Sequence, residues 1–462
     1  MRGDFTRDTF QQREHFSRVL MQQGRVTLDA DHNEQASILL TYLRTLARDL
    51  IGPYAAPYES GGFQLSYPSQ NANGFIIGAG RYYVDGILVE NDKDCAYGQQ
   101  PDFPVASTDP LLQEIQTPTG KTYWIYLDVW ERHITCIEDD SIREVALNGP
   151  DTCTRAKVVW QVKALPYTLR EREGDKEVAA PSCTEPLQGL TAISSATMAA
   201  QVDPGKQSTD PCVLSPAAKY RGAENQLYRV EIHQSGAAGT ATFKWSRDNG
   251  SVATAWLGWD GKSQLTVANA RGFSSGNWVE LSDSSNDLLG TPGTLVLVTK
   301  VDNGSLTLDP STLPSAGISF SANLSKPKVR RWDQTQTGDI RLVSGAVPIT
   351  EGTPAAPQWI DLEDGIQVQF TAGGQYRTGD YWEIPARVAT GNIEWPQTKS
   401  AGGASAPAAI APDGIRHYYA PLGFVSWTPG QGFSGRPCRC EFDPLSSCFV
   451  RQRQDVDVNP VG

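Results

Sequence analysis

The sequence predicts a mainly β protein, in which an N-terminal extended arm and one helix precede two or more antiparallel β-sandwich or β-barrel domains. Glycine (43 residues) and proline (30 residues) are well above their usual share, which favours many short strands joined by tight turns. Only residues 33–51 show the apolar repeat of a long helix. Several shorter segments alternate apolar and polar residues, as strands with one buried face do.

The first 53 residues start as a polar, extended arm that reaches a turn at Gly24 and Arg25. A helix is expected to follow, with Asp31 as its N-cap and Glu34, three residues later, satisfying a second free N–H group. Gly52 accepts a left-handed C-cap, and the proline after it prevents continuation of the helix.

The apolar residues of this helix recur at alternating spacings of four and three residues, which places them on one face. They are Ala36, Leu40, Leu43, Ala47 and Leu50. A polar arm that leads into a narrow apolar face is typical of an attachment device, so we expect residues 1–53 to be a docking arm and helix. The alternative is that the helix packs on its own domain.

The remainder of the chain is expected to be divided into β-rich blocks. In order, these are a first β-domain at 54–165, an irregular linker or surface excursion at 166–222, a second β-domain at 223–325, and a third β-domain or continuation at 326–462 with a mobile loop at 401–412. A hairpin is expected to turn at Asp85 and Gly86 in the first block. Residues 226–233 alternate as a half-buried strand in the second.

Two segments of the second half are similar to each other. They are residues 273–281 and 376–384. Each has a Gly-Asn or Gly-Asp turn followed by an aromatic strand, which places Trp278 near Glu280 and Trp382 beside Glu383. Sugars stack on flat aromatic faces, and a glycoside hydrolase needs two carboxylates across a cleft, so these four residues are possible glycan contacts. The alternative is that the aromatic side chains pack in the cores of sheets.

Eight cysteines are spread along the chain. Cys438, Cys440 and Cys448 could supply three thiolates to a metal, but their spacing lacks the usual C-x2–4-C pair of a zinc site, so they are weak metal candidates. Cys183 and Cys212 flank a Pro/Ser/Thr-rich loop and could form a disulfide, and free buried thiols are the third alternative. No nucleotide-binding, metalloprotease or nucleophile-elbow motif occurs, so no catalytic residue and no cofactor is expected.

The net charge of −12 and the isoelectric point near 5.0 argue against nucleic acid as a partner, because phosphate binding needs clustered Lys and Arg. The densest basic cluster, formed by Lys326, Lys328, Arg330 and Arg331, is expected to be a solvated strand edge. No apolar stretch approaches the ~20 residues of a membrane-spanning helix. Without an apolar signal-peptide core, synthesis in the cytoplasm and no membrane insertion are expected.

One stretch of the arm and helix resembles a known family. The run FSRVLMQQGRVTLDADHNEQ (residues 16–35) is similar to the N-terminal signature of poorly characterised proteins encoded in contractile injection system clusters, the phage-tail-like machines of bacteria. Phage tail fibre and baseplate adaptors carry a looser version. Further stretches that resemble this family are ENQLYRVEIH (224–233), FKWSRDNGSV (243–252), GDYWEIPAR (379–387), IEWP (393–396) and HYYAPLGFV (417–425).

The resemblance implies a non-enzymatic structural component of a contractile injection system or related tail-like particle, at its baseplate, spike or fibre end. Its partners would be other particle subunits, in a homo-oligomer of three-fold or six-fold symmetry, within a particle that stays in the cytoplasm or is released. The expected assembly interface comprises Phe16, Gly24, Arg25, Asp29, Asp31, Asn33, Ala36, Leu40, Leu43, Ala47 and Leu50. The alternative is a glycan-binding or glycan-hydrolysing tip protein that contacts a surface glycan.

Overall fold

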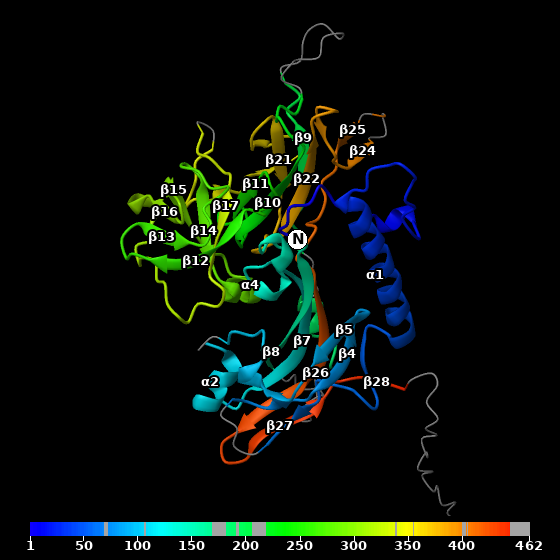
Figure 1. Ribbon diagram of the computed structural model, residues 1–462. Helices are drawn as coiled ribbons and strands as arrows, with labels where there is room; N and C mark the ends of the chain where they lie inside the picture. Colours follow the sequence, from blue (N-terminus) through cyan, green and yellow to red (C-terminus); the bar gives the residue numbers. More distant parts are fainter. Residues whose placement is uncertain are drawn as a thin grey trace, which may run out of the picture.

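The structure of the chain is a computed structural model (Figure 1). It describes residues 1–68, 73–105, 108–168, 182–190, 194–205, 219–337, 340–353, 355–399, 403 and 405–443. The protein is mainly β, with 39% of its residues in strands and 14% in helices, which confirms the predicted class and the N-terminal helix. In the part of the chain that the structure describes, no helix has both the length and the apolar character needed to cross a membrane.

The N-terminal helix α1 spans Asp29–Ile51, so it starts before the predicted cap. Leu28 holds the N-cap position, and the carboxylate of Asp31 accepts a hydrogen bond from the Leu28 N–H at 3.0 Å. The prediction of Asp31 as N-cap was wrong because this carboxylate caps the helix from inside its first turn. Gly52 ends the helix as predicted, and its N–H donates to the carbonyl oxygen of Arg48 at 2.8 Å. Its φ of 94° is positive, but its ψ of −173° lies outside the left-handed helical conformation that was predicted for this cap.

The first β unit consists of three sheets, with strand orders β28-β1-β4-β5, β27-β26-β7-β8 and β2-β3-β6. Its strands are β1 (Tyr54–Pro57), β2 (Leu65–Ser66), β3 (Ile76–Ile77), β4 (Gly80–Val84), β5 (Ile87–Asn91), β6 (Cys95–Ala96), β7 (Thr122–Ile134), β8 (Arg155–Tyr167), β26 (His417–Thr428), β27 (Gly432–Pro437) and β28 (Glu441–Phe442). The predicted hairpin is confirmed: β4 pairs with β5, and both Asp85 and Gly86 have the positive φ that a two-residue turn requires. The sheets enclose one apolar core.

The second β unit contains a five-stranded sheet, β18-β11-β10-β22-β23, and a second sheet in which β9, β19 and β20 flank β21. Its strands are β9 (Met198–Val202), β10 (Gln226–Gln234), β11 (Thr242–Ser246), β18 (Val347–Pro348), β19 (Glu351–Gly352), β20 (Ile360–Asp361), β21 (Ile366–Thr371), β22 (Tyr381–Arg387) and β23 (Asn392–Ile393). The two sheets share one apolar core. A strand of this unit, β9, lies in the segment 166–222 that was expected to be irregular.

The third β unit is a closed barrel of strand order β12-β13-β16-β15-β14-β17. Its strands are β12 (Ala253–Trp259), β13 (Gln264–Val267), β14 (Trp278–Ser282), β15 (Thr294–Asp302), β16 (Ser305–Leu308) and β17 (Lys328–Trp332). The alternate side chains of these strands fill the barrel with a separate apolar core.

Short elements complete the fold. They are α2 (Pro110–Gln116), α3 (Leu187–Leu190), α4 (Ser284–Leu289), the hairpin of β24 (Gln397–Lys399) and β25 (Ser405–Pro407), and 3-10 turns η1 (Gln12–Glu14), η2 (Tyr97–Gln99), η3 (Asp140–Ile142), η4 (Val145–Leu147) and η5 (Pro310–Thr312). Strand β25 falls within the expected mobile loop 401–412, so this part of the loop is paired.

The three units are nested in the chain. The barrel lies between β11 and β18 of the second unit, and the second unit lies between β8 and β26 of the first. Strand β26 pairs with β7 over nearly its whole length, so the end of the chain completes the sheet that the first block begins. In Figure 1 the barrel lies to the left, the first unit below the second, and α1 runs along the right side.

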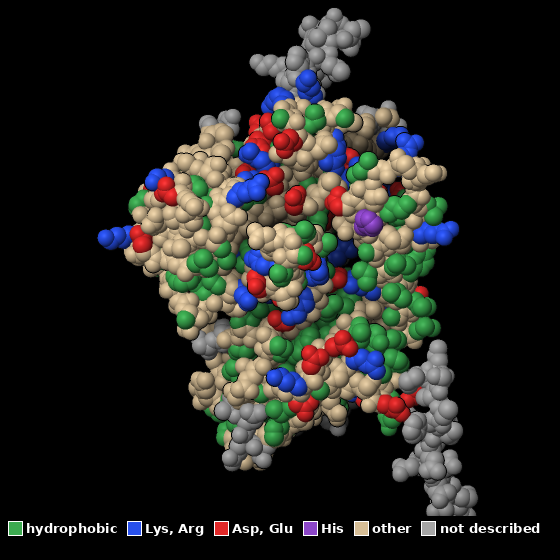
Figure 2. Space-filling model, viewed as in Figure 1, with side chains coloured by type: hydrophobic (Ala, Val, Ile, Leu, Met, Phe, Trp, Pro, Cys, Tyr) green, Lys and Arg blue, Asp and Glu red, His purple; other side chains and the backbone are tan. Residues whose placement is uncertain are grey.

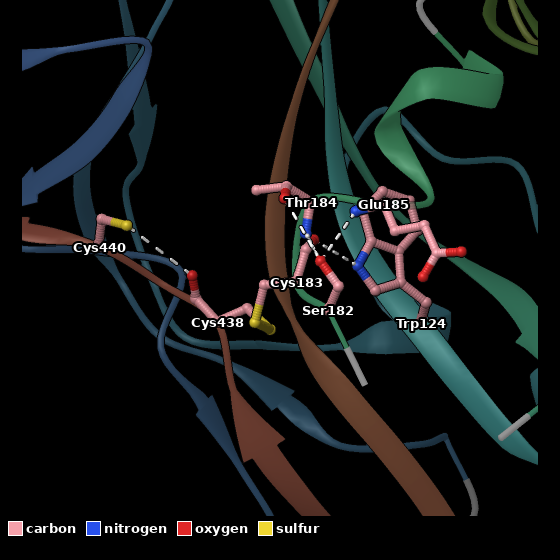
Figure 3. Close-up of a disulfide and its surroundings, with 7 residues drawn as sticks. All are labelled: Trp124, Ser182, Cys183, Thr184, Glu185, Cys438 and Cys440. Atoms are coloured by element: carbon pink, nitrogen blue, oxygen red, sulfur yellow. Dashed lines mark hydrogen bonds between the residues drawn. A yellow bond between two sulfur atoms is a disulfide. The ribbon is translucent and has the colours of Figure 1, made fainter. Parts of the chain in front are cut away.

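A disulfide joins Cys183, just before α3, to Cys438, just after β27 (Figure 3). The expected partner of Cys183, Cys212, lies outside the described residues, and so does Cys448. Cys440 remains a free, exposed thiol. Because the sulfur of Cys438 is bonded to that of Cys183, Cys438 is not free to ligate a metal, which removes the basis of the proposed three-thiolate cluster.

Candidate functional site

The outward face of the five-stranded sheet is polar and buried. Along β10, Arg229, Glu231 and His233 alternate with apolar residues that point into the core of the second unit. The predicted alternation is therefore confirmed, but Arg229 and Glu231 on the polar side are also buried. Lys244 of β11 adds a buried ammonium to the same face. Such a face must be covered by other parts of the chain, because buried charges need partners.

The covering element on one side is the outer wall of the barrel. Lys328 and Arg330 lie on one face of β17 and are buried, so the prediction of a solvated basic edge was wrong for these two residues. Glu280 lies opposite Arg330 in the register of β14 and β17. Its carboxylate accepts from the ammonium of Lys244 at 2.6 Å and from the indole of Trp332 at 2.9 Å.

The tip of the N-terminal arm enters between the sheet and the barrel. The guanidinium of Arg2 forms a two-point ion pair with Glu231, with Nε–Oε2 at 2.9 Å and NH2–Oε1 at 2.6 Å. The side-chain amide of Asn249 donates to the carbonyl oxygens of Met1 and Gly3 at 2.9 and 3.0 Å. The first residues of the arm are thus an internal anchor, whereas the whole arm had been expected to dock elsewhere.

The first unit and α4 close the remaining side. Asp287 of α4 is within ion-pair distance of Arg2 (3.3 Å), of Arg132 at the end of β7 (3.2 Å) and of Lys328 (2.5 Å). Lys328 also reaches Glu138 at 2.7 Å. One aspartate therefore binds cations from the arm, the first unit and the barrel, which are far apart in the sequence.

A cavity of about 310 Å³ lies at this junction, and we call it the junction cavity. Its walls come from the arm tip, α1, β7, β10, β14, β17 and the segment before β26. In Figure 1 the N-terminus lies in the middle of the molecule, between the three units. Figure 2 shows acidic and basic side chains gathered on this central part of the visible face.

The cations keep the carboxylates of the junction ionised. Burial alone would raise the pKa of Glu231, but the charges of Arg2, Arg229 and Lys244 lower it well below its ordinary value. Burial likewise opposes ionisation of Glu280, and Lys244 lowers the pKa of that group to about 2. Burial and nearby positive charge act together on His133 and lower its pKa to about 3, so its ring is neutral at pH 7.

Glu231 and Glu280 are poorly suited to act as general acids. The depressed pKa values leave Glu231 and Glu280 without a proton to donate at neutral pH, and both carboxylates are occupied by ion pairs. Within the described ranges, no group of three or more His, Cys, Asp or Glu side chains is arranged to hold a metal ion. The charged side chains of the junction hold one another in ion pairs.

Of the four possible glycan contacts only Glu280 lines the junction cavity, and the four do not form an exposed sugar-binding face. Trp382 is 0% exposed, and its indole donates to the carbonyl oxygen of Ile410 at 2.9 Å inside the second unit. Trp278 packs beside buried residues of the barrel wall. Glu280 is buried with Lys244, and Glu383 lies near Met1 and Arg229. The prediction of aromatic core packing, given as the alternative, describes Trp382.

The predicted apolar stripe of α1 faces solvent. Leu43 and Leu46 are 63% and 57% exposed, and only Ala30 and Ile38 of the helix are buried. We use the term α1 outer face for the exposed apolar side chains of the helix and of the arm before it: Phe16, Leu20, Met21, Val26, Leu28, Leu39, Leu40, Tyr42, Leu43, Leu46 and Leu50. Figure 2 shows hydrophobic side chains along the edge where α1 lies.

The inward side of α1 is held mainly by polar contacts. Arg44 forms a two-point ion pair with Glu131 of β7, at 3.0 and 2.9 Å, and Arg48 lies 2.9 Å from Asp85. The backbone of Arg44 lies against Gly86, so closely that a Cβ atom on Gly86 would collide with the Arg44 carbonyl. The helix thus reverses the usual arrangement, in which the apolar stripe faces the core.

The other residues of the expected assembly interface lie on or beside this surface. Gly24 has a φ of 70°, as its turn requires, and Arg25, Asn33 and Ala36 are exposed. Ala47 is partly buried. Asp29 instead has an internal role, because its carboxylate accepts from the N–H and hydroxyl of Thr6 at 2.9 and 2.7 Å and so ties the arm to the start of the helix.

The junction itself was not foreseen from the sequence. The only signal was the alternation of charged and apolar residues in β10 and in β17, which indicates that charged side chains share one face. That signal does not identify which surface covers the face, and an exposed strand would show the same pattern.

A model of one protein family matches the chain at residues 1–180 and 171–461, and the family is described as a family of unknown function (DUF6519). The chain belongs to this family. No curated protein and no solved structure matches the chain significantly.

Proposed function

We propose that this member of a family of unknown function is a non-enzymatic structural component of a contractile injection system or a related tail-like particle. It would sit at the baseplate, spike or fibre end and attach to other particle subunits through the α1 outer face. The observation that carries this proposal is the outward orientation of the apolar stripe of α1. The resemblance of residues 16–35 to proteins of such gene clusters supports the choice of a particle subunit as the partner.

The physical argument starts from the cost of leaving this face in water. Eleven large apolar side chains of the arm and helix are exposed on this surface, and burying a Leu-sized side chain contributes about 1.5–3 kcal/mol. Monomeric proteins rarely expose contiguous apolar patches of this kind, and those that do commonly use them for binding. The helix is also held to its own body mainly by ion pairs, which leaves its apolar side for a partner.

The proposed occupant is a neighbouring protein subunit. The resemblance implies repeated parts of three-fold or six-fold symmetry, so a second copy of this chain or a neighbouring particle protein would cover the face. Leu39, Leu43, Leu46 and Leu50 recur at spacings of three and four, as the contact residues of a helix that lies in a groove do. Such a contact is compatible with a second copy of the chain and with another particle protein.

The test compares Leu43→Asp/Leu46→Asp with Leu257→Asp, a matched control that changes an exposed leucine of the barrel (55% exposed). Size-exclusion chromatography with light scattering gives the mass in multiples of 50.3 kDa, and co-purification tests attachment to the particle. We expect the double variant to lose self-association and particle attachment with an unchanged melting temperature, and the control to keep both. A wild-type protein that is monomeric and does not attach to particles would refute the proposal.

A further inference from the structure

The junction cavity carries an excess of positive charge. Among the described residues that line it, eight are Arg or Lys and six are Asp or Glu, although the whole chain has a net charge of −12. The basic residues are Arg2, Arg44, Arg132, Arg229, Lys244, Lys328, Arg330 and Arg416, and the acidic residues are Glu131, Glu138, Glu231, Glu280, Asp287 and Asp413. The excess is therefore a local property of this cavity.

Among the described cations that line the cavity, Arg330 and Arg416 have no carboxylate within ion-pair distance, and of these two only Arg330 is buried. Its side chain is 4% exposed, and its guanidinium donates to the carbonyl oxygen of Gly250. Across the described parts of the chain, no Asp or Glu oxygen lies within ion-pair distance of it, whereas Lys328, two residues earlier on the same face, has two such partners. Arg132 is a second incompletely satisfied guanidinium, because its buried Nε has no acceptor among the described atoms.

A buried guanidinium cannot relieve this deficit by losing its proton. Arginine remains charged at any physiological pH, so the cost of burial has to be offset by an anion nearby. The carboxylates whose charges act most on Arg330 are already engaged. Glu138 is paired with Lys328, Asp287 with three cations, and Glu231 with Arg2, Arg229 and Lys244. The protein thus presents paired carboxylates and one buried guanidinium, that of Arg330, without a carboxylate partner among the described residues at the wall of the cavity.

We propose that the junction cavity binds a small oxyanion, of the size and charge of phosphate or sulfate, against the guanidinium of Arg330. The planar fork of an arginine matches two oxygens of such an anion, which is the geometry in which arginine binds most tightly. A volume of about 310 Å³ is ample, since a water molecule in the liquid occupies about 30 Å³. The ligand would connect the barrel to the arm and to the first unit.

This inference is independent of the α1 outer face and predicts a different property, a thermal stability that depends on the anion. Inorganic phosphate and sulfate are the probes, and chloride at equal ionic strength is the reference for general salt effects. We expect phosphate and sulfate to raise the melting temperature of the full chain by about 2–4 °C at roughly 100 to 1,000 times the dissociation constant, and chloride not to. Equilibrium dialysis with labelled phosphate should give one anion per chain.

Two variants and a control separate the site from its surroundings. Arg330→Met keeps an apolar stem and removes the unpaired charge, so it should abolish the phosphate and sulfate response and raise the melting temperature in chloride. Arg330→Lys keeps the positive charge but lacks the planar guanidinium that can donate to two oxygens at once. It should therefore still be stabilised by phosphate and sulfate, but bind them at least tenfold more weakly. Arg155→Met, which changes an exposed arginine of β8, should respond as the wild type does.

The proposal is overturned if phosphate, sulfate and chloride stabilise the wild-type chain equally, or if Arg330→Met keeps the full phosphate response. Should Arg330→Met fail to fold, the dialysis stoichiometry of the wild type and the weakened binding of Arg330→Lys still decide the matter. No phosphate retained by the folded wild type would overturn it as well.

Discussion

Arg2 and Glu231 form a two-point ion pair across 229 positions of the sequence, with both oxygen–nitrogen distances below 3 Å. This contact holds the start of the arm on the polar face of β10, and Asp287 of α4 extends it to the barrel. The arm therefore has two parts with different roles: an inner tip that joins the three units and an outer stretch, from Phe16 onward, that is exposed.

Replacing Arg2 with Met should destabilise the protein by about 3 kcal/mol, because Glu231 would stay buried with one partner fewer. Arg13→Met is the matched control: it also removes an arm arginine with one carboxylate neighbour, Glu14, but at a solvent-exposed site that contributes less than about 1 kcal/mol. Urea unfolding measures both, and proteolysis of the native chain should cut the arm faster in Arg2→Met. Equal effects of the two substitutions would contradict an anchoring role for the tip.

Gly86→Ala should detach α1 from the first unit. The new Cβ would collide with the carbonyl oxygen of Arg44, and the φ of 82° adds strain. Gly120→Ala is matched in backbone conformation, with a φ of 74°, but has open space around the new Cβ and should lose only about 1 kcal/mol. Hydrogen exchange should show faster exchange in α1 for Gly86→Ala alone, and similar protection in both variants would rule out this close contact.

Acid should weaken the junction in a defined pH range. The folded-state pKa values of Glu280 and Glu138 are about 2, below their ordinary value of 4.5, because Lys244 and Lys328 offset the effect of burial. A carboxylate whose pKa is lower in the folded state than in the unfolded state stabilises the fold. This stabilisation is complete above pH 4.5 and is lost as the pH falls towards 2. In that range, each of the two groups should add about 1.4 kcal/mol per pH unit to the slope of the unfolding free energy against pH.

The measurement is the unfolding free energy of the wild type and of Glu280→Gln between pH 5 and pH 3. The variant should start less stable and lose less on acidification. Asp413 acts in the opposite sense, because burial raises its pKa to about 6 and protonation on acidification favours the folded state. If the unfolding free energy of the wild type depends on pH no more steeply than that of Glu280→Gln, Glu280 is not ion-paired in solution.

Oxidation should stabilise the chain through Cys183 and Cys438. The bond closes a loop of 255 residues, and removing such a cross-link typically costs about 2–5 kcal/mol. Cys438→Ser should lower the melting temperature under oxidising conditions and make it insensitive to a reductant. Cys440→Ser changes an exposed free thiol two residues away and should behave as the wild type. A wild type that responds no more to reductant than Cys438→Ser would contradict the pairing.

The elements of this fold that depend on neighbouring residues were predictable from the sequence. The alternation in residues 226–233 located β10, and the Asp85–Gly86 pair located a hairpin turn, because both signals come from local geometry. The helix was placed correctly to within a turn at its start. Its apolar stripe was also identified, although a pattern on one helix does not state which side faces its own domain.

The contacts between distant segments could not be predicted in this way. Lys328 and Arg330 belong to a run of basic residues that looks solvent-exposed in the sequence. They are buried because the barrel packs against the other two units, where Lys328 reaches Glu138 of the first unit. Trp382 and Glu383 are neighbours in the sequence but point to opposite faces of β22, one into the core and one towards the arm. Residues of a strand alternate between faces, so adjacency in the sequence did not indicate a shared site.

The nested order of the units constrains how a nascent chain folds on the ribosome. Strand β7 ends at Ile134, and its neighbour in the sheet, β26, begins at His417. At typical synthesis rates, β26 is therefore synthesised roughly 15–60 s after β7. The barrel, contained in residues 253–332, is complete long before then. Folding should proceed from the innermost unit outwards, with the exposed edge of β7 as the segment that a holding chaperone would have to cover.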